Sequence, residues 1–239
     1  MSISLDQALE LTRTGDVWLF RGRSVADRAI QLTTNSPVNH VGMSVVIEDM
    51  PALMWHAELG KSLPDRWAGT RQRGVQLHDL RDAVLVWAKR YGQRAWLRQL
   101  EPPASGAAED AVLRTIARLD GTPFPSTAQL GWRWLNGRVP RLRRPGRSGQ
   151  PQEPGQAQEP DQPQEPGQTP QPGHVPEQSA AALETAYCAE VVAITYEAMG
   201  LLTPRRRPSW YDPGRFWSGD ALVLAGGSVL GEEIAVDVV

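Results

Sequence analysis

The stretch that decides the fold is residues 185–200, which read TAYCAEVVAITYEAMG. Its apolar residues recur at helical spacing, and Gly200 follows, a residue type that commonly ends helices. The pattern predicts a helix over residues 185–199 with Cys188, the single cysteine of the chain, in its first turn. Backbone N–H groups at a helix start lower the pKa of a thiol, so Cys188 is a candidate nucleophile. The other interpretation is an inert core thiol, since cysteine is among the most buried residue types.

Two histidines precede this helix on segments that have the composition of neighbouring strands. Residues 40–47 begin with His40, and residues 52–58 follow after a short turn and contain His56 and Glu58. If the two strands pair, His56 lies beside His40. An imidazole can accept a proton from a thiol near neutral pH, and a second imidazole can hold its tautomer. Glu58 faces the same side of its strand as His56 and is the alternative for the orienting role.

The rest of the chain predicts a mixture of helices and antiparallel strands. Helices are expected at residues 5–11, 25–33 and 109–120. Further strands are expected at residues 17–20, 74–77, 84–87, 222–224 and 234–238. Because helices and strands do not alternate regularly, the pattern predicts an α+β fold.

A proline-rich segment divides the chain. Half of the twenty prolines fall within residues 140–176, where Gln-Glu-Pro recurs. Such a segment cannot bury enough apolar surface to offset its ordering entropy, so we expect a disordered insert. Residues 1–139 and 177–239 are then two parts of one domain. The insert is interpreted as a tether, with binding to a partner protein as the alternative.

Composition excludes several functional classes. With 25 Lys+Arg against 27 Asp+Glu the net charge is −2, which argues against a nucleic-acid binder. No apolar run is long enough to span a membrane, and the N-terminal residues lack the pattern of a secretory signal, so a cytoplasmic location is expected. A zinc site of His40, His56 and Cys188 is set aside because these residues include no close ligand pair. No metal or other cofactor is expected.

Several segments, taken in order, resemble a known superfamily. They are GDVWLFRG (15–22), TTNSPVNHVGMSVVI (33–47), LMWHAE (53–58), DGTPFP (120–125), AYCAEVVAITYEAMGL (186–201) and SWYDPGRFW (209–217). The series resembles the circularly permuted branch of the NlpC-type papain-like superfamily. This branch contains the YiiX/YaeF-like cysteine hydrolases and is related to lecithin:retinol acyltransferase-like proteins. The order His40 before Cys188 is the one that permutation predicts.

The resemblance implies an antiparallel sheet packed against a helix that bears the nucleophile. Cys188 would attack an amide, ester or thioester carbonyl, His40 would take the thiol proton, and His56 or Glu58 would orient His40. The backbone N–H of Cys188 would help to bind the oxyanion. The implied substrates are small peptide-like amides or lipid acyl groups, and transfer of the acyl group to an acceptor is the alternative to hydrolysis. Many YiiX-like relatives have Glu where this chain has His56.

A non-catalytic module on the same fold is the competing hypothesis. Two basic and aromatic clusters could contact an acidic lipid surface, which leaves peripheral membrane contact open. The simpler interpretation is a solvated charged edge. The clusters contain Trp132, Trp134, Arg138, Arg141, Arg143, Arg144 and Arg147, and then Arg205, Arg206 and Arg207.

Overall fold

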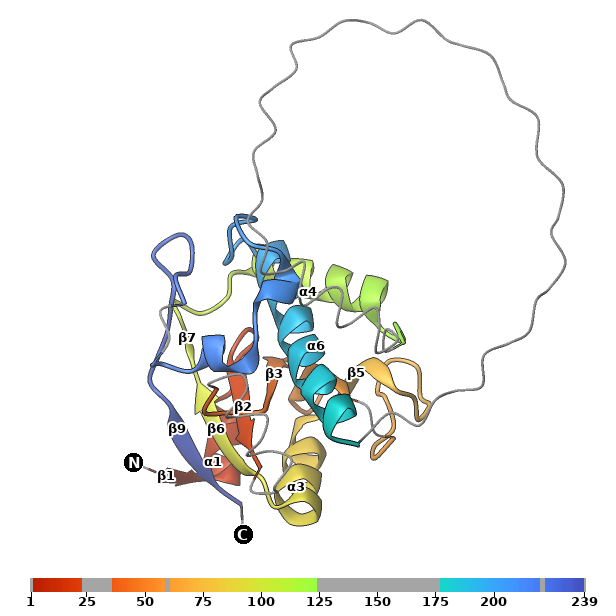
Figure 1. Cartoon of the computed structure of the whole chain (residues 1–239). Helices are drawn as coiled ribbons and strands as arrows, with labels where there is room; N and C mark the ends of the chain where they lie inside the picture. The colour runs from red at the N-terminus through yellow and green to blue at the C-terminus, as the bar shows by residue number, and fades with distance from the viewer. Residues whose placement is uncertain (1, 23–35, 59–60, 124–176, 220–221, 239) are drawn as a thin grey trace, which may run out of the picture.

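A computed structural model describes residues 2–22, 36–58, 61–123, 177–219 and 222–238 of the chain (Figure 1). The predicted helix at residues 25–33 and the proline-rich insert at residues 140–176 lie outside these ranges.

Seven strands form one sheet in the order β1-β9-β6-β2-β3-β4-β5. Neighbouring strands are antiparallel, except that β1 and β9 run parallel. The strands are β1 (Ser2–Ser4), β2 (Val17–Arg21), β3 (His40–Val45), β4 (Leu53–Glu58), β5 (Gly74–Asp79), β6 (Arg94–Arg98) and β9 (Ile234–Asp237). A second, two-stranded sheet pairs β7 (Leu100–Glu101) with β8 (Val229–Leu230). The predicted α+β class with a mostly antiparallel sheet is therefore confirmed.

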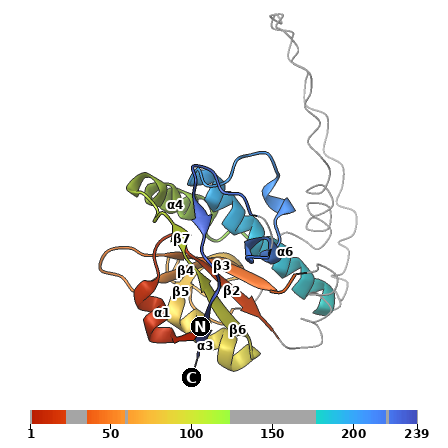
Figure 2. The same ribbon diagram turned by 90° about the vertical axis from the view of Figure 1, so that its left-hand side faces the viewer.

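Helices cover both faces of the large sheet (Figures 1 and 2). One face packs against α6 (Glu177–Ala198), and the other packs against α1 (Leu5–Leu11) and α3 (Leu80–Tyr91). Successive residues of a strand point to opposite faces, so β4 sends Trp55 into the α6 layer and Met54 into the α3 layer. Every residue of β4 is buried, including the polar His56 and Glu58.

Capping residues account for the helix ends. The side chain of Asp79 accepts a hydrogen bond from the backbone N–H of Asp82 at the start of α3, and Gly92 in the left-handed conformation ends that helix. Ser105 caps α4 (Gly106–Leu119) in the same way. Two short 3-10 helices, η1 (Pro208–Trp210) and η2 (Pro213–Phe216), follow α6.

Three predictions about these elements are wrong. Residues 84–87 are not a strand but belong to α3, whose buried residues Leu80, Ala83, Val84 and Trp87 have helical spacing. Residues 222–224 form no strand, and the late pairing with β7 begins at Val229 instead. Helix α6 begins at Glu177, several residues before the predicted start.

Candidate functional site

A row of buried histidines crosses three adjacent strands of the sheet. His40 Nε2 lies 3.2 Å from His56 Nδ1, and His56 Nε2 lies 3.0 Å from His78 Nδ1. The row ends on β5, where His78 Nε2 lies 3.0 Å from Gln76 Oε1. We call these four residues the histidine relay. The structure thus brings together His40 and His56, as predicted, and adds two residues that were not.

The relay lies on the α3 face of the sheet. His40, His56 and His78 occupy alternate strand positions that face away from α6, and Trp87 of α3 packs edge-on against His40 and His56 at centroid distances of 4.4 and 4.9 Å. Phe20 of β2 completes the contact with His40. The aromatic rings exclude water from this polar row. A ring nitrogen that lost its partner could not bond to water instead, so the loss of any hydrogen bond within the row would destabilise the fold.

Burial keeps the three imidazoles neutral. Desolvation lowers the pKa of His40 to about 3 and that of His78 to about 4. The pKa of His56 is well below its usual value because of desolvation first and the neighbouring histidines second. At neutral pH each ring therefore has one N–H donor and one nitrogen lone pair.

The hydrogen bonds run in one direction along the relay. Because Gln76 Oε1 can only accept, His78 Nε2 carries its proton and His78 Nδ1 accepts from His56 Nε2–H. His56 Nδ1 then accepts from His40 Nε2–H, which leaves His40 Nδ1 as an acceptor at the end of the row. Gln76 Nε2 is buried and has no partner among the described residues.

Glu58 adds a carboxylate beside the relay. One of its oxygens, Oε2, lies 3.8 Å from His78 Nδ1, and Ser62 Oγ donates to both of its oxygens. Burial raises the pKa of Glu58, while the hydrogen bond from Ser62 and the charge of Arg90 oppose the shift. One donor atom each from His56, Glu58 and His78 lies within 4.8 Å of the other two, and all three residues are buried. This group has the composition of a metal site.

Cys188 occupies the opposite layer of the protein. Its side chain is buried in the apolar cluster that contains Val41 and Trp55, on the α6 face of the sheet. The hydroxyl of Tyr196 donates to the carbonyl of Gly15 at the start of β2, next to the end of β3. Cys188 is eight residues before Tyr196 and packs in the layer between α6 and the sheet, whereas His40 packs against Trp87 in the opposite layer. The sheet therefore separates the sulfur from the relay.

The early start of α6 changes the environment expected for Cys188. The residue is eleven positions after Glu177, so it lies inside the helix and not in its first turn. Only the first four N–H groups of a helix lack an intrahelical acceptor. The argument that a helix N-terminus lowers the pKa of this thiol and offers its backbone N–H to an oxyanion therefore does not apply.

His78 and Gln76 are site residues that the sequence-based prediction did not include, although the sequence contains a signal for them. They occupy alternate positions of β5, and Gln76 is the cross-strand partner of His56. The predicted strand ended at residue 77, one residue short of His78. Extending it would have placed His56, Glu58, Gln76 and His78 on one face of a paired hairpin.

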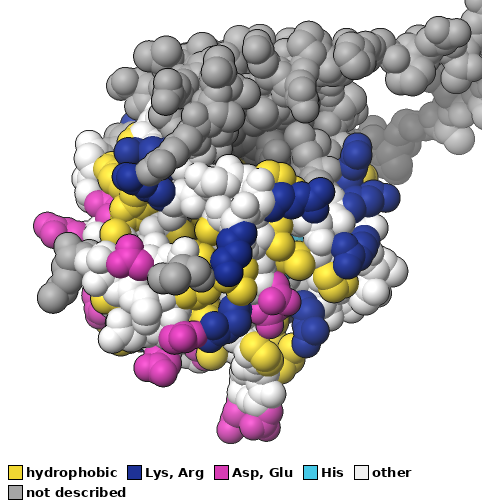
Figure 3. Space-filling view, turned by 90° about the horizontal axis from the view of Figure 1, so that it is seen from below, with side chains coloured by type: hydrophobic (Ala, Val, Ile, Leu, Met, Phe, Trp, Pro, Cys, Tyr) yellow, Lys and Arg dark blue, Asp and Glu magenta, His cyan; other side chains and the backbone are white. Residues whose placement is uncertain are grey.

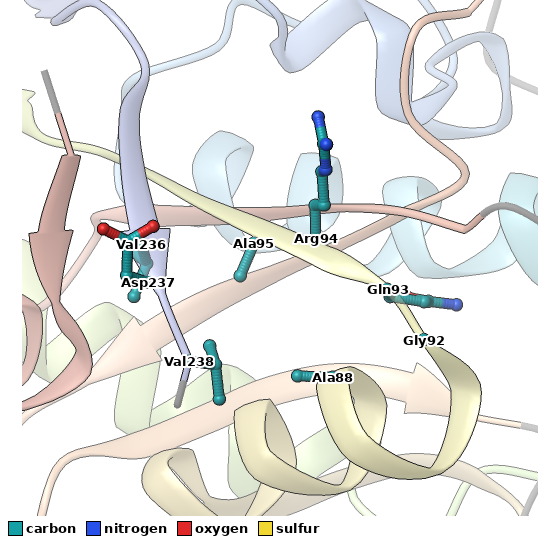
Figure 4. A pocket seen from close by; sticks show the side chains of 8 residues that line it. All are labelled: Ala88, Gly92, Gln93, Arg94, Ala95, Val236, Asp237 and Val238. Carbon is teal, nitrogen blue, oxygen red and sulfur yellow. The ribbon is translucent and has the colours of Figure 1, made fainter.

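A surface hollow of about 520 Å³ lies apart from the relay, between the end of α3 and strands β6 and β9 (Figure 4). Arg94 and Asp237 are its charged lining residues.

Of the predicted basic clusters, residues 132–147 lie outside the described ranges, whereas Arg206 and Arg215 both stack on Trp210, at 4.8 and 4.3 Å. In the described parts of the chain, no helix combines the length and apolar character that a membrane span requires.

Comparisons with known proteins found a likeness among solved structures. No family model matches the chain, and no curated protein matches it. Among solved structures, the chain is similar to one described as the metalloprotein yiiX from Escherichia coli O157:H7, with 22% identity and a TM-score of 0.36. The match covers 48% of this chain and 54% of that one, so the chain spans about half of the length of the structure that it matches. The similarity is to a YiiX-like protein, and it does not test membership of the wider NlpC-type papain-like superfamily.

Proposed function

We propose that this chain binds a divalent transition-metal ion, with zinc as the best fit, through His56 Nε2, His78 Nδ1 and a carboxylate oxygen of Glu58. The observation that carries the proposal is the convergence of these three donor atoms within 4.8 Å in a buried site. The ligands come from two strands that pair in register, which fixes their relative positions.

The distances suit a tetrahedral ion. Zinc–nitrogen and zinc–oxygen bonds of roughly 2.0–2.2 Å place neighbouring ligand atoms about 3.3–3.6 Å apart. In this site His56 Nε2 and His78 Nδ1 are 3.0 Å apart, and His78 Nδ1 and Glu58 Oε2 are 3.8 Å apart. Small side-chain adjustments therefore suffice to admit the ion.

The surrounding groups also suit a metal site. Neutral imidazoles are the form that binds metals, and burial keeps His56 and His78 neutral. A metal at His56 Nε2 requires that the protons of His56 and His40 both move to Nδ1, so that His56 Nδ1–H donates to His40 Nε2 in the metal-bound form. Each ligating histidine has a partner for its other nitrogen: His40 for His56, and Gln76 for His78. Such partners fix the ring orientation in metal sites. Three protein ligands leave a fourth position, the arrangement in which bound zinc lowers the pKa of a water molecule.

Metal binding to matched variants tests the proposal. Purified protein is stripped with a chelator, dialysed against zinc and analysed for bound metal, and Co²⁺ absorption reports the ligand geometry. We expect one ion per chain in the wild type and in His174→Ala, the variant of the one histidine outside the relay. His78→Ala and Glu58→Gln should each bind at least tenfold more weakly. Equal loss in His174→Ala, or no binding at micromolar zinc in the wild type, would contradict the proposal.

A thiol hydrolase or acyltransferase is the second candidate. Its support is the hydrogen bond between His40 and His56, the predicted base and its orienting group. In this scheme Cys188 forms an acyl-enzyme with a peptide-like amide or lipid acyl group, and water or an acceptor releases it. The scheme requires a rearrangement of α6 that carries the sulfur to the histidine face.

Thiol reactivity distinguishes the two candidates. A reactive Cys188 predicts rapid labelling by iodoacetamide in the native protein, together with loss of labelling in Cys188→Ala and slower labelling in His40→Ala. A buried, inert thiol predicts labelling only after denaturation. The metal candidate predicts instead that Cys188→Ala binds zinc as the wild type does.

A further inference from the structure

The segment between β4 and β5 presents a tryptophan to solvent among positive charges. Trp67 is 52% exposed, although tryptophan usually buries most of its surface. Four cations accompany it within residues 61–73, and all are exposed: Lys61, Arg66, Arg71 and Arg73. We call residues 61–73 the basic loop.

A buried carboxylate holds the basic loop in shape. Asp65, only 1% exposed, accepts hydrogen bonds from the backbone N–H groups of Trp67 (3.3 Å) and Ala68 (3.0 Å) and from Gln72 Nε2 (3.0 Å). It also accepts one from the N–H of Leu77 in β5, at 2.9 Å. These contacts tie the loop to the edge of the sheet and keep the indole of Trp67 at its surface.

Further hydrogen bonds leave the loop little freedom. Arg71 Nη1 donates to the carbonyl of Ser62 at 2.7 Å, and the backbone of Asp65 bonds in both directions with the turn at residues 69–70. A loop that is ordered in advance loses little conformational entropy when it binds a partner.

The charge of the loop is strongly one-sided. Asp65 is its single acidic residue, and it is buried, so the exposed charge of the loop is entirely positive. The whole chain has a net charge of −2, so this positive charge is a local feature. The face seen in Figure 3 shows Lys and Arg together with Asp and Glu among apolar side chains.

We infer that the basic loop docks on an anionic lipid bilayer, with Trp67 at the level of the headgroups and the cations against the lipid phosphates. Tryptophan favours this interface because its indole has an apolar body and a polar N–H. Each cation close to an anionic membrane increases binding roughly fivefold. Proteins that bind single-stranded nucleic acids stack successive bases on several aromatic rings, whereas Trp67 is the one aromatic residue of the basic loop, which favours a bilayer.

Binding to vesicles tests the inference. The full-length protein is sedimented with vesicles of phosphatidylcholine containing 30% phosphatidylglycerol, and with vesicles of phosphatidylcholine alone. We expect binding to the anionic vesicles that 0.5 M NaCl weakens strongly, since salt screens exposed charges. Arg66→Ser/Arg73→Ser should reduce binding at least tenfold, and Trp67→Ala should reduce it severalfold.

A matched double variant supplies the control. Arg205→Ser/Arg206→Ser removes two exposed cations from the basic stretch beside Trp210, and should bind as the wild type does. Circular dichroism confirms that each variant is folded. Equal binding to neutral vesicles, equal loss in the Arg205/Arg206 variant, or loop-dependent binding of single-stranded DNA without vesicle binding would overturn the inference. All arms are run with chelator present, so the result is independent of the metal site.

Discussion

Replacing Gln76 by leucine should weaken metal binding while leaving the metal-free fold nearly as stable. Gln76 is wholly buried on β5 and touches no proposed metal ligand atom directly; its Oε1 accepts from His78 Nε2, on the far side of the ring from Nδ1. Leucine has a similar volume and no acceptor. The His78 ring then loses the contact that fixes its orientation and tautomer.

The expected effects on metal affinity and on stability follow from comparing the metal-bound protein with the metal-free protein. Loss of such a partner typically costs 10–100-fold in metal affinity, or about 1.4–2.7 kcal/mol. Without metal, the substitution leaves His78 Nε2 unpaired but also removes Gln76 Nε2, which already has no partner among the described residues. These changes oppose each other, so the free energy of unfolding should change by about 1 kcal/mol or less.

Calorimetric titration with zinc and thermal unfolding with and without zinc measure the two quantities separately. Gln76→Glu keeps an acceptor and should retain the wild-type affinity or exceed it. The wild type at zinc concentrations 100-fold above its Kd should gain about 2.7 kcal/mol, and Gln76→Leu should gain less at the same concentration. If Gln76→Leu binds zinc as tightly as the wild type, or if Gln76→Glu loses as much as Gln76→Leu, the assigned role of Gln76 is refuted.

Three further predictions concern stability. The pKa of Asp120 is raised to about 7, first by burial and then by the nearby Asp65, so the folded protein binds an extra proton between about pH 4 and 7 and loses stability as the pH rises through this range. Asp120→Asn should therefore raise the unfolding temperature at pH 8 but change it little at pH 4, as thermal scans across this range would show. Trp55 Nε1 donates to Thr195 Oγ1 at 3.0 Å, so a double-mutant cycle of Trp55→Phe and Thr195→Val in urea should give a coupling energy of about 1 kcal/mol; strict additivity would contradict the role of this bond in joining α6 to the sheet. Gly74 has φ +118°, and a Cβ there would collide with backbone atoms of the neighbouring segment, so Gly74→Ala should destabilise the fold by more than about 2 kcal/mol in urea unfolding, whereas unchanged stability would show that the backbone shifts freely.

The positions of His40, His56 and Glu58 could be predicted from sequence, because the alternation of side chains along a strand depends only on neighbouring residues. The spacing of His56 and Glu58 places them on one face of a strand, and the short turn before it brings His40 alongside. The helix side could not be predicted in the same way. Helical spacing places Cys188 on an apolar face but does not say which face of the sheet that helix covers.

Two errors in the prediction have identifiable physical causes. Helix α6 extends back to Glu177 because the preceding residues include an alanine run, which has high helix propensity and no stop signal. The valines at 84 and 86 resemble a strand, but the buried residues of this segment recur at helical spacing and Asp79 caps the helix start. In both places a short-range signal outweighed the residue type that the prediction followed.

The histidine relay also limits how the sheet can be assembled. A slip of one residue between β3 and β4, or between β4 and β5, would turn a row of polar rings toward the α6 layer and leave their nitrogens unpaired in hydrocarbon. The same side chains that make up the site therefore specify the alignment of three strands. Substitutions that abolish the row would make misaligned forms of the sheet more competitive, so these positions are constrained by strand alignment as well as by the proposed metal site.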